Sequence, residues 1–103
     1  MKVILNTDNH VQGDEPLAEH VDGVVESVLG RFGKQITRVE VHLSDANGGK
    51  AGNDDKHCVM EARLEGLQPI AVENDAETMR AAISGAAHKL KRALDSALGK
   101  LDK

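Results

Sequence analysis

Aromatic side chains are almost absent from this sequence. Among its 103 residues Phe32 is the only phenylalanine, and there is no tyrosine or tryptophan. Proteins that bind single-stranded nucleic acid by stacking bases use aromatic platforms, so this mode of binding is nearly excluded. We expect no deep aromatic ligand pocket and no small-molecule substrate. Binding to nucleic acid would have to rely on phosphate contacts and shape.

Cysteine and long apolar runs are equally scarce. The single Cys58 cannot form an internal disulfide, so nothing indicates an oxidising compartment. No apolar stretch approaches the length of a membrane span. The apolar residues near the N-terminus are too few for a secretory signal, and Asp8 follows them closely. We therefore expect a cytoplasmic protein without a membrane partner.

Residues that could perform catalysis or bind a metal form no recognisable pattern. His57 and Cys58 are adjacent, so on a strand they point to opposite faces and cannot share a metal. His42 and His57 could be cross-strand neighbours, but two histidines alone make a weak site. Cys58 is expected in the core rather than as a nucleophile. Residues 47–50 (Asn-Gly-Gly-Lys) lack the spacing of a phosphate loop. We expect no enzyme, no metal and no cofactor.

Positive charge is in deficit overall but gathers near the C-terminus. Thirteen Lys and Arg residues face seventeen Asp and Glu residues, a net charge of −4. From Arg80 onward six cationic and two acidic residues give a net charge of +4. The preceding residues, with seven cationic and fifteen acidic residues, have a net charge of −8. This asymmetry favours a helix presented to an anionic partner. The simpler alternative is an ordinary solvated helix face with cations near its C-terminus.

Residues 74–103 predict one long amphipathic helix. Apolar residues recur along it every three or four positions: Met79, Ile83, Ala86, Leu90, Leu94, Ala97 and Leu101. Asn74 is expected to cap this helix, with Glu77 completing a capping box. The remaining faces carry the cations: Arg92 with His88 opposite the stripe, Arg80 and Lys91 on one flank, and Lys89 and Lys100 on the other.

The other segments predict a β-α-β-β-β-α order. Alternating or β-branched runs predict strands at 2–7, 36–45, 55–66 and 69–73. An apolar stripe predicts a helix that starts at residues 14–16 and ends near Gly33. Residues 46–54 are interpreted as a flexible hairpin loop.

These elements predict a two-layer α+β fold. The helix between the first two strands should make them parallel, and Pro69 suggests that the last strand lies at an edge. Each helix has one apolar stripe and the sheet has one apolar face. We therefore expect a four-stranded mixed sheet with both helices packed on one face, in a single domain over residues 1–103.

The whole chain resembles the short ribosome hibernation promoting factors, the family of protein Y, also known as the sigma-54 modulation or ribosome-associated inhibitor family. Six segments carry the resemblance: Lys2–Thr7, Pro16–Leu17 with His20–Val21, Val39–Leu43, Glu65–Gly66, Glu77–Ile83 and Lys89–Leu94. The combination of length, element order and the Lys-Leu-Lys-Arg context is more specific than any one motif.

The resemblance implies a βαβββα fold similar to double-stranded RNA-binding domains. It implies a non-enzymatic translation inhibitor that binds rRNA of the small ribosomal subunit in the mRNA/tRNA cleft and preserves idle ribosomes under stress. We expect a monomer, without the C-terminal extension by which long members pair two ribosomes. Seven residues form the predicted rRNA-binding set: Lys89 and Arg92, which match best by position, then Lys91, Lys100, Arg80, Arg31 and Lys34.

The first helix departs from the family pattern. Family members usually carry several basic residues along it, whereas this chain has Glu19, Asp22 and Glu26 there. An alternative is therefore a protein-interaction module of the same fold, which has lost rRNA binding and binds a basic partner through these acids.

Overall fold

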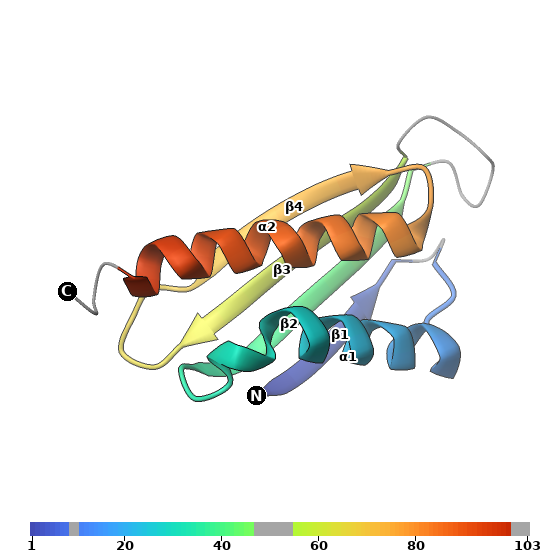
Figure 1. Cartoon of the computed structure of the whole chain (residues 1–103). Helices are drawn as coiled ribbons and strands as arrows, with labels where there is room; N and C mark the ends of the chain where they lie inside the picture. The colour runs from blue at the N-terminus through green and yellow to red at the C-terminus, as the bar shows by residue number, and fades with distance from the viewer. Residues whose placement is uncertain (9–10, 47–54, 100–103) are drawn as a thin grey trace.

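The computed structural model describes residues 1–8, 11–46 and 55–99 (Figure 1). Its elements follow one another as β1 (Lys2–Thr7), α1 (Glu15–Leu29), the short 3-10 helix η1 (Gly30–Phe32), β2 (Ile36–Asp45), β3 (Lys56–Leu64), β4 (Ile70–Ala76) and α2 (Met79–Gly99). The predicted β-α-β-β-β-α order is confirmed. The predicted glycine-rich loop lies, from residue 47 onward, outside the described residues.

The four strands form one mixed sheet in the order β1-β2-β3-β4. β1 runs parallel to β2, and the other two pairs are antiparallel. Both helices cover the same face of the sheet, as Figure 1 shows. The two-layer α+β prediction is therefore confirmed, including the edge position of β4.

Alternation along the central strands builds the core. Every second side chain of β2 and β3 is buried beneath the helices: Val39, Val41, Leu43, Cys58, Met60 and Ala62. The helices add their own buried residues: Val21, Val25 and Leu29 from α1, and Ala82, Ile83, Ala86, Ala87, Leu90 and Leu94 from α2. The intervening residues of β2 and β3, which are mostly polar, point to the opposite face of the sheet.

The start of α2 differs from the prediction. Asn74 was expected to cap the helix, but β4 continues through it to Ala76 and pairs residue by residue with β3. Every second pair of opposite residues in this antiparallel ladder exchanges two hydrogen bonds, and these bonds outweigh the capping preference of one asparagine. Thr78 supplies the cap instead, because its Oγ1 accepts a hydrogen bond from the Ala81 backbone N–H at 3.1 Å. The predicted Asn74 cap with a Glu77 box is wrong.

Asn74 fixes α2 against β4 in another way. Its side-chain Nδ2 donates to the Ala82 carbonyl oxygen at 3.3 Å. A Cβ placed on Gly85 would lie only 2.1 Å from this nitrogen. Glycine at position 85 therefore permits the close approach of α2 to β4, and this approach orients the cations of the helix.

Candidate nucleic-acid interface

The cations of α2 lie outside its apolar stripe, which is buried against the core. Arg80, Lys89 and Arg92 are exposed, and Lys91 is half-buried. Successive residues turn by about 100°, so these side chains divide between the flank facing α1, the outer side of the helix and the flank facing β4. The contacts of Arg80 and Lys91 on one flank and of Lys89 on the other agree with the predicted arrangement.

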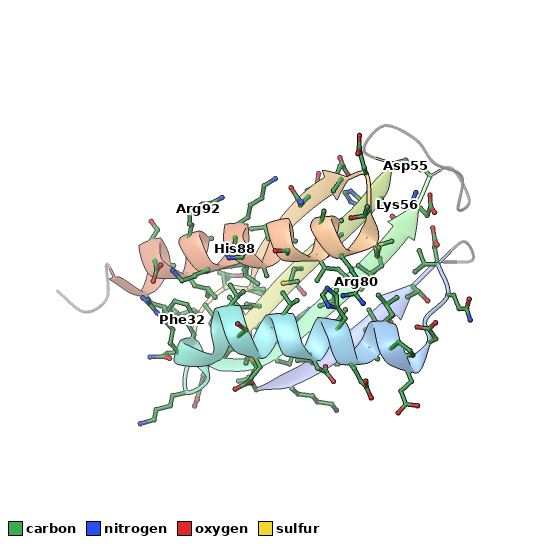
Figure 2. All side chains as sticks on the ribbon, turned by 45° about the vertical axis from the view of Figure 1, so that its right-hand side comes forward. Phe32, Asp55, Lys56, Arg80, His88 and Arg92 are labelled. Carbon is green, nitrogen blue, oxygen red and sulfur yellow. The ribbon has the colours of Figure 1, made fainter. Side chains whose placement is uncertain are left out.

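Arg80 lies on the flank that faces α1. Its Nη1 is 3.3 Å from Nδ1 of His20, which belongs to α1. A guanidinium group can only donate, so His20 Nδ1 accepts and the proton of the neutral ring is on Nε2. Figure 2 shows Arg80 between the two helices. This contact ties the N-terminal half of α2 to α1 and keeps a cation at their junction.

Asp95 joins two further cations at the other end of the helix pair. Its Oδ1 pairs with Nη2 of Arg31 in η1, and its Oδ2 lies 3.6 Å from Nζ of Lys91, one turn earlier in α2. The Arg31 guanidinium also lies over the Phe32 ring, 4.8 Å from the ring centre, an arrangement with favourable cation–π geometry. Two predicted residues from distant segments, Arg31 and Lys91, thus meet at one carboxylate.

The remaining predicted residues are dispersed. Lys89 faces β4, where its Nζ donates to the Glu73 carbonyl oxygen at 3.0 Å. Arg92 lies on the outer side of α2 (Figure 2) and forms no ion pair or hydrogen bond with the part of the chain that the structure describes. Lys34, after η1, is also exposed. Lys100 lies outside the described residues.

The comparisons with known proteins identify the family. Residues 4–102 match the family described as Sigma 54 modulation protein / S30EA ribosomal protein. The chain belongs to this family. Membership in the S30EA family makes it one of the ribosome-associated modulation factors, which are not a known class of enzymes, and confirms the resemblance found in the sequence. No curated protein sequence matches the chain.

Solved structures of low sequence identity share the S30EA fold. The N-terminal domain of Thermus thermophilus Protein Y is 19% identical, with a TM-score of 0.75 over 93% of this chain and 98% of that one. A ribosomal subunit interface protein from Coxiella burnetii is 14% identical, with a TM-score of 0.80 over 96% of this chain and 99% of that one. The fold is therefore retained although few side chains are.

Within this S30EA chain, α1 presents a purely acidic surface. Glu15, Glu19, Asp22 and Glu26 are exposed at intervals of three or four residues, so they line one side of the helix. None of the four forms an ion pair with the residues that the structure describes. An acidic stripe thus lies on α1 while the cations lie on α2 and η1, and an RNA strand would be attracted to one helix and repelled by the other.

Two histidines outside the predicted rRNA-binding set, His20 and His88, also lie between the helices. A groove between the helices is lined by His20 and Val24 of α1 and by Ser84 and His88 of α2. His88 Nδ1 lies 2.8 Å from the Ser84 carbonyl oxygen and therefore donates to it. The ring of His20 has its Nε2 fully enclosed, without a hydrogen-bond partner among the described residues. The family resemblance included the His20-Val21 pair, but it did not predict that His20 contacts Arg80.

Residues 1–8, 11–46 and 55–99 contain no group of three or more His, Cys, Asp or Glu placed to hold a metal ion. His42 is opposite Val59 and His57 is opposite Ser44, so the two histidines are diagonal rather than direct neighbours. Cys58 is fully buried, as predicted, and burial raises the pKa of its thiol to about 12. Neither described helix is apolar enough over its length to span a membrane.

Proposed function

We propose that this protein is a non-enzymatic, cytoplasmic translation inhibitor that binds the small ribosomal subunit and holds ribosomes in a hibernating state under stress. It would contact rRNA in the cleft that receives mRNA and tRNA. The observation that carries the proposal is the cationic surface of the helix layer, formed by Arg31, Arg80, Lys91 and Arg92, in a chain of a ribosome-associated family. One structural relative is named as a ribosomal subunit interface protein, which supports the same partner.

The physical basis of binding would be phosphate contact. The chain has a net charge of −4, so attraction to RNA has to come from a local surface rather than from the total charge. Each phosphate neutralised by Lys or Arg contributes about −0.7 to −0.9 to the slope of log K against log salt. Four such contacts predict a slope of about −3 to −4 and about a hundredfold loss of affinity between 50 and 200 mM salt.

Co-sedimentation with isolated small ribosomal subunits across a salt series tests the proposal. We expect wild-type protein to pellet with the subunits at low salt and to be released steeply as salt rises. Arg92→Glu should weaken binding and flatten the salt slope by about 1. This residue is suited to the test because it is exposed and forms no hydrogen bond or ion pair with a described residue, so its replacement should not disturb the fold.

Lys2→Glu is the matched control. It changes the net charge by the same amount, but Lys2 is exposed on β1, beside Arg38 on the face of the sheet that the helices leave open. We expect Lys2→Glu to bind like wild type apart from a small effect of total charge. Equal weakening by both variants would contradict a localised interface on α2, and absence of binding at any salt would contradict the proposed function.

A second candidate function rests on the acidic stripe of α1. Four exposed carboxylates without ion pairs among the described residues favour a basic protein as the partner. In that case the protein should bind basic proteins and fail to bind subunit RNA. Glu19→Gln with Asp22→Asn should abolish such binding, whereas under the first proposal the same double variant should bind subunits more tightly.

A further inference from the structure

Asp95 occupies an unusual place in the cationic surface. It is the acidic residue at the centre of two cations that come from different elements, Arg31 of η1 and Lys91 of α2. Each carboxylate oxygen contacts a different cation: Oδ1 contacts Arg31 Nη2, and Oδ2 contacts Lys91 Nζ. A phosphate group bridges two cations in the same manner, with one oxygen directed at each.

We propose that Arg31 and Lys91 form a phosphate-binding subsite and that the Asp95 carboxylate occupies it in the free protein. On binding, a phosphodiester of RNA displaces the carboxylate and takes up both contacts. Asp95 is thus an internal competitor that lowers the affinity of the surface for RNA. The identification of the ligand as ribosomal RNA rests on the proposed function. The existence of the anion subsite does not depend on it.

Local structure supports a site that keeps its shape when the carboxylate leaves. The Arg31 guanidinium has a second contact besides Asp95, because it lies over the Phe32 ring, and the Phe32 ring itself is buried. Arg31 and Lys91 belong to η1 and α2, and both elements are held in the core by buried residues, Phe32 of η1 and Leu90 and Leu94 of α2. The cations are therefore arranged before the ligand arrives, which lowers the entropic cost of binding.

The exposure of the three side chains makes displacement feasible. Arg31, Lys91 and Asp95 side chains are 61%, 37% and 36% exposed, so an RNA strand can reach the cations and water can solvate the departing carboxylate. Exposed ion pairs of this kind contribute little to folding. The guanidinium fork of Arg31 also matches two phosphate oxygens. The internal pairing is thus weak enough to be exchanged for a phosphate.

Asp95→Asn tests the proposal because it removes the charge and keeps the shape. The matched control is Glu73→Gln, which changes the net charge equally; the Glu73 side chain is 74% exposed and belongs to β4 at the edge of the sheet. We expect Asp95→Asn to bind small ribosomal subunits about two- to fivefold more tightly than wild type, as expected from the contribution of one exposed charge pair. Glu73→Gln should change affinity by less than about twofold.

Titration with inorganic phosphate, followed by NMR of the Arg31 side-chain Nε–H, gives a readout that needs no ribosome. Phosphate should shift this signal at lower concentration in Asp95→Asn than in wild type or in Glu73→Gln. If phosphate behaves so but no variant binds subunits, the subsite exists and the proposed function fails. If subunits bind wild type, yet Asp95→Asn binds no more tightly than Glu73→Gln, the inference is overturned and the proposed function remains. An Arg31 signal that phosphate does not shift in Asp95→Asn also overturns it.

Discussion

Two glycines in the middle of the helices are predicted to respond in opposite ways to the same substitution. Gly23 is in α1 and Gly85 is in α2. A Cβ at position 23 would meet no atom within 4 Å, whereas a Cβ at position 85 would lie 2.1 Å from Nδ2 and 2.8 Å from Cγ of Asn74. The comparison of Gly23→Ala with Gly85→Ala therefore separates the helix propensity of alanine from the packing of α2 against β4.

The magnitudes follow from the contacts. Alanine in place of glycine in a helix interior stabilises by about 1 kcal/mol, and this is the whole expected effect at position 23. At position 85 the methyl group must displace Asn74, which breaks the hydrogen bond to the Ala82 carbonyl oxygen at a cost of about 1 kcal/mol. Overpacking adds about 1–3 kcal/mol. The net result at position 85 is a loss of about 1–3 kcal/mol, so the two variants should differ by about 2–4 kcal/mol.

Urea unfolding followed by circular dichroism measures the free energy of unfolding of each variant. We expect Gly23→Ala to unfold at higher urea than wild type and Gly85→Ala at lower urea. Adding Asn74→Ala to Gly85→Ala removes the clashing side chain, so the double variant should lose less stability than the sum of the two single variants. If Gly85→Ala were stabilised as much as Gly23→Ala, the close approach of α2 to Asn74 would be refuted.

Two further predictions concern titrating groups. Burial raises the pKa of the Cys58 thiol to about 12, so the thiol stays protonated at pH 8 and iodoacetamide should label it only as fast as the chain unfolds; rapid labelling of folded protein would contradict its burial. For Lys56, the hydrogen bond to Asp55, together with the charge of Asp45, raises the pKa above 10.5. The stabilisation from these contacts is therefore present below pH 10.5 and lost as the pH rises through the raised pKa. The difference in free energy of unfolding between wild type and Lys56→Met should shrink above pH 10.5, and a difference independent of pH would contradict an ionic contribution.

Local patterns predicted most of the fold. The run 36–45 alternates between apolar and polar residues, and β2 has the predicted bounds, Ile36–Asp45, because one face of the sheet is buried and the other is not. The start of α1 was also readable, since the Asp14 side chain accepts a hydrogen bond from the Leu17 backbone N–H as a helix cap does. These features depend on neighbours in the sequence, which is why the sequence is sufficient to predict them.

The start of α2 was misplaced because it depends on a distant segment. Residues 74–76 contain an asparagine and an aspartate, which favour turns and caps. Pairing with β3 nonetheless extends β4 to Ala76, and no pattern within residues 70–80 reveals this pairing. The meeting of Arg31 with Asp95 is of the same kind, because 64 residues separate the partners. The sequence proposed a set of cations for the surface, but it could not predict which of them pair with residues of distant segments.

The engagement of Lys89 leads to a prediction that the sequence could not make. Lys89 and Arg92 had equal weight as rRNA-binding residues, yet Lys89 Nζ donates to the Glu73 carbonyl oxygen at the edge strand, and Arg92 forms no hydrogen bond or ion pair with a described residue. Each substitution by Glu removes two units of positive charge, but Lys89→Glu also breaks a contact between α2 and β4. We expect Lys89→Glu to lower the free energy of unfolding by about 1 kcal/mol and to weaken subunit binding less than Arg92→Glu does.

Measurement of both quantities on the same protein samples separates the two roles of Lys89. Urea unfolding gives the stability of each variant, and co-sedimentation at a fixed concentration of folded protein gives its binding. Lys89→Met is the matched control, because it keeps the length of the side chain and loses the donor without adding an acid. If Lys89→Glu weakened binding as much as Arg92→Glu while leaving stability unchanged, Lys89 would be free to leave Glu73, and its place would be on the RNA surface rather than on the edge of β4.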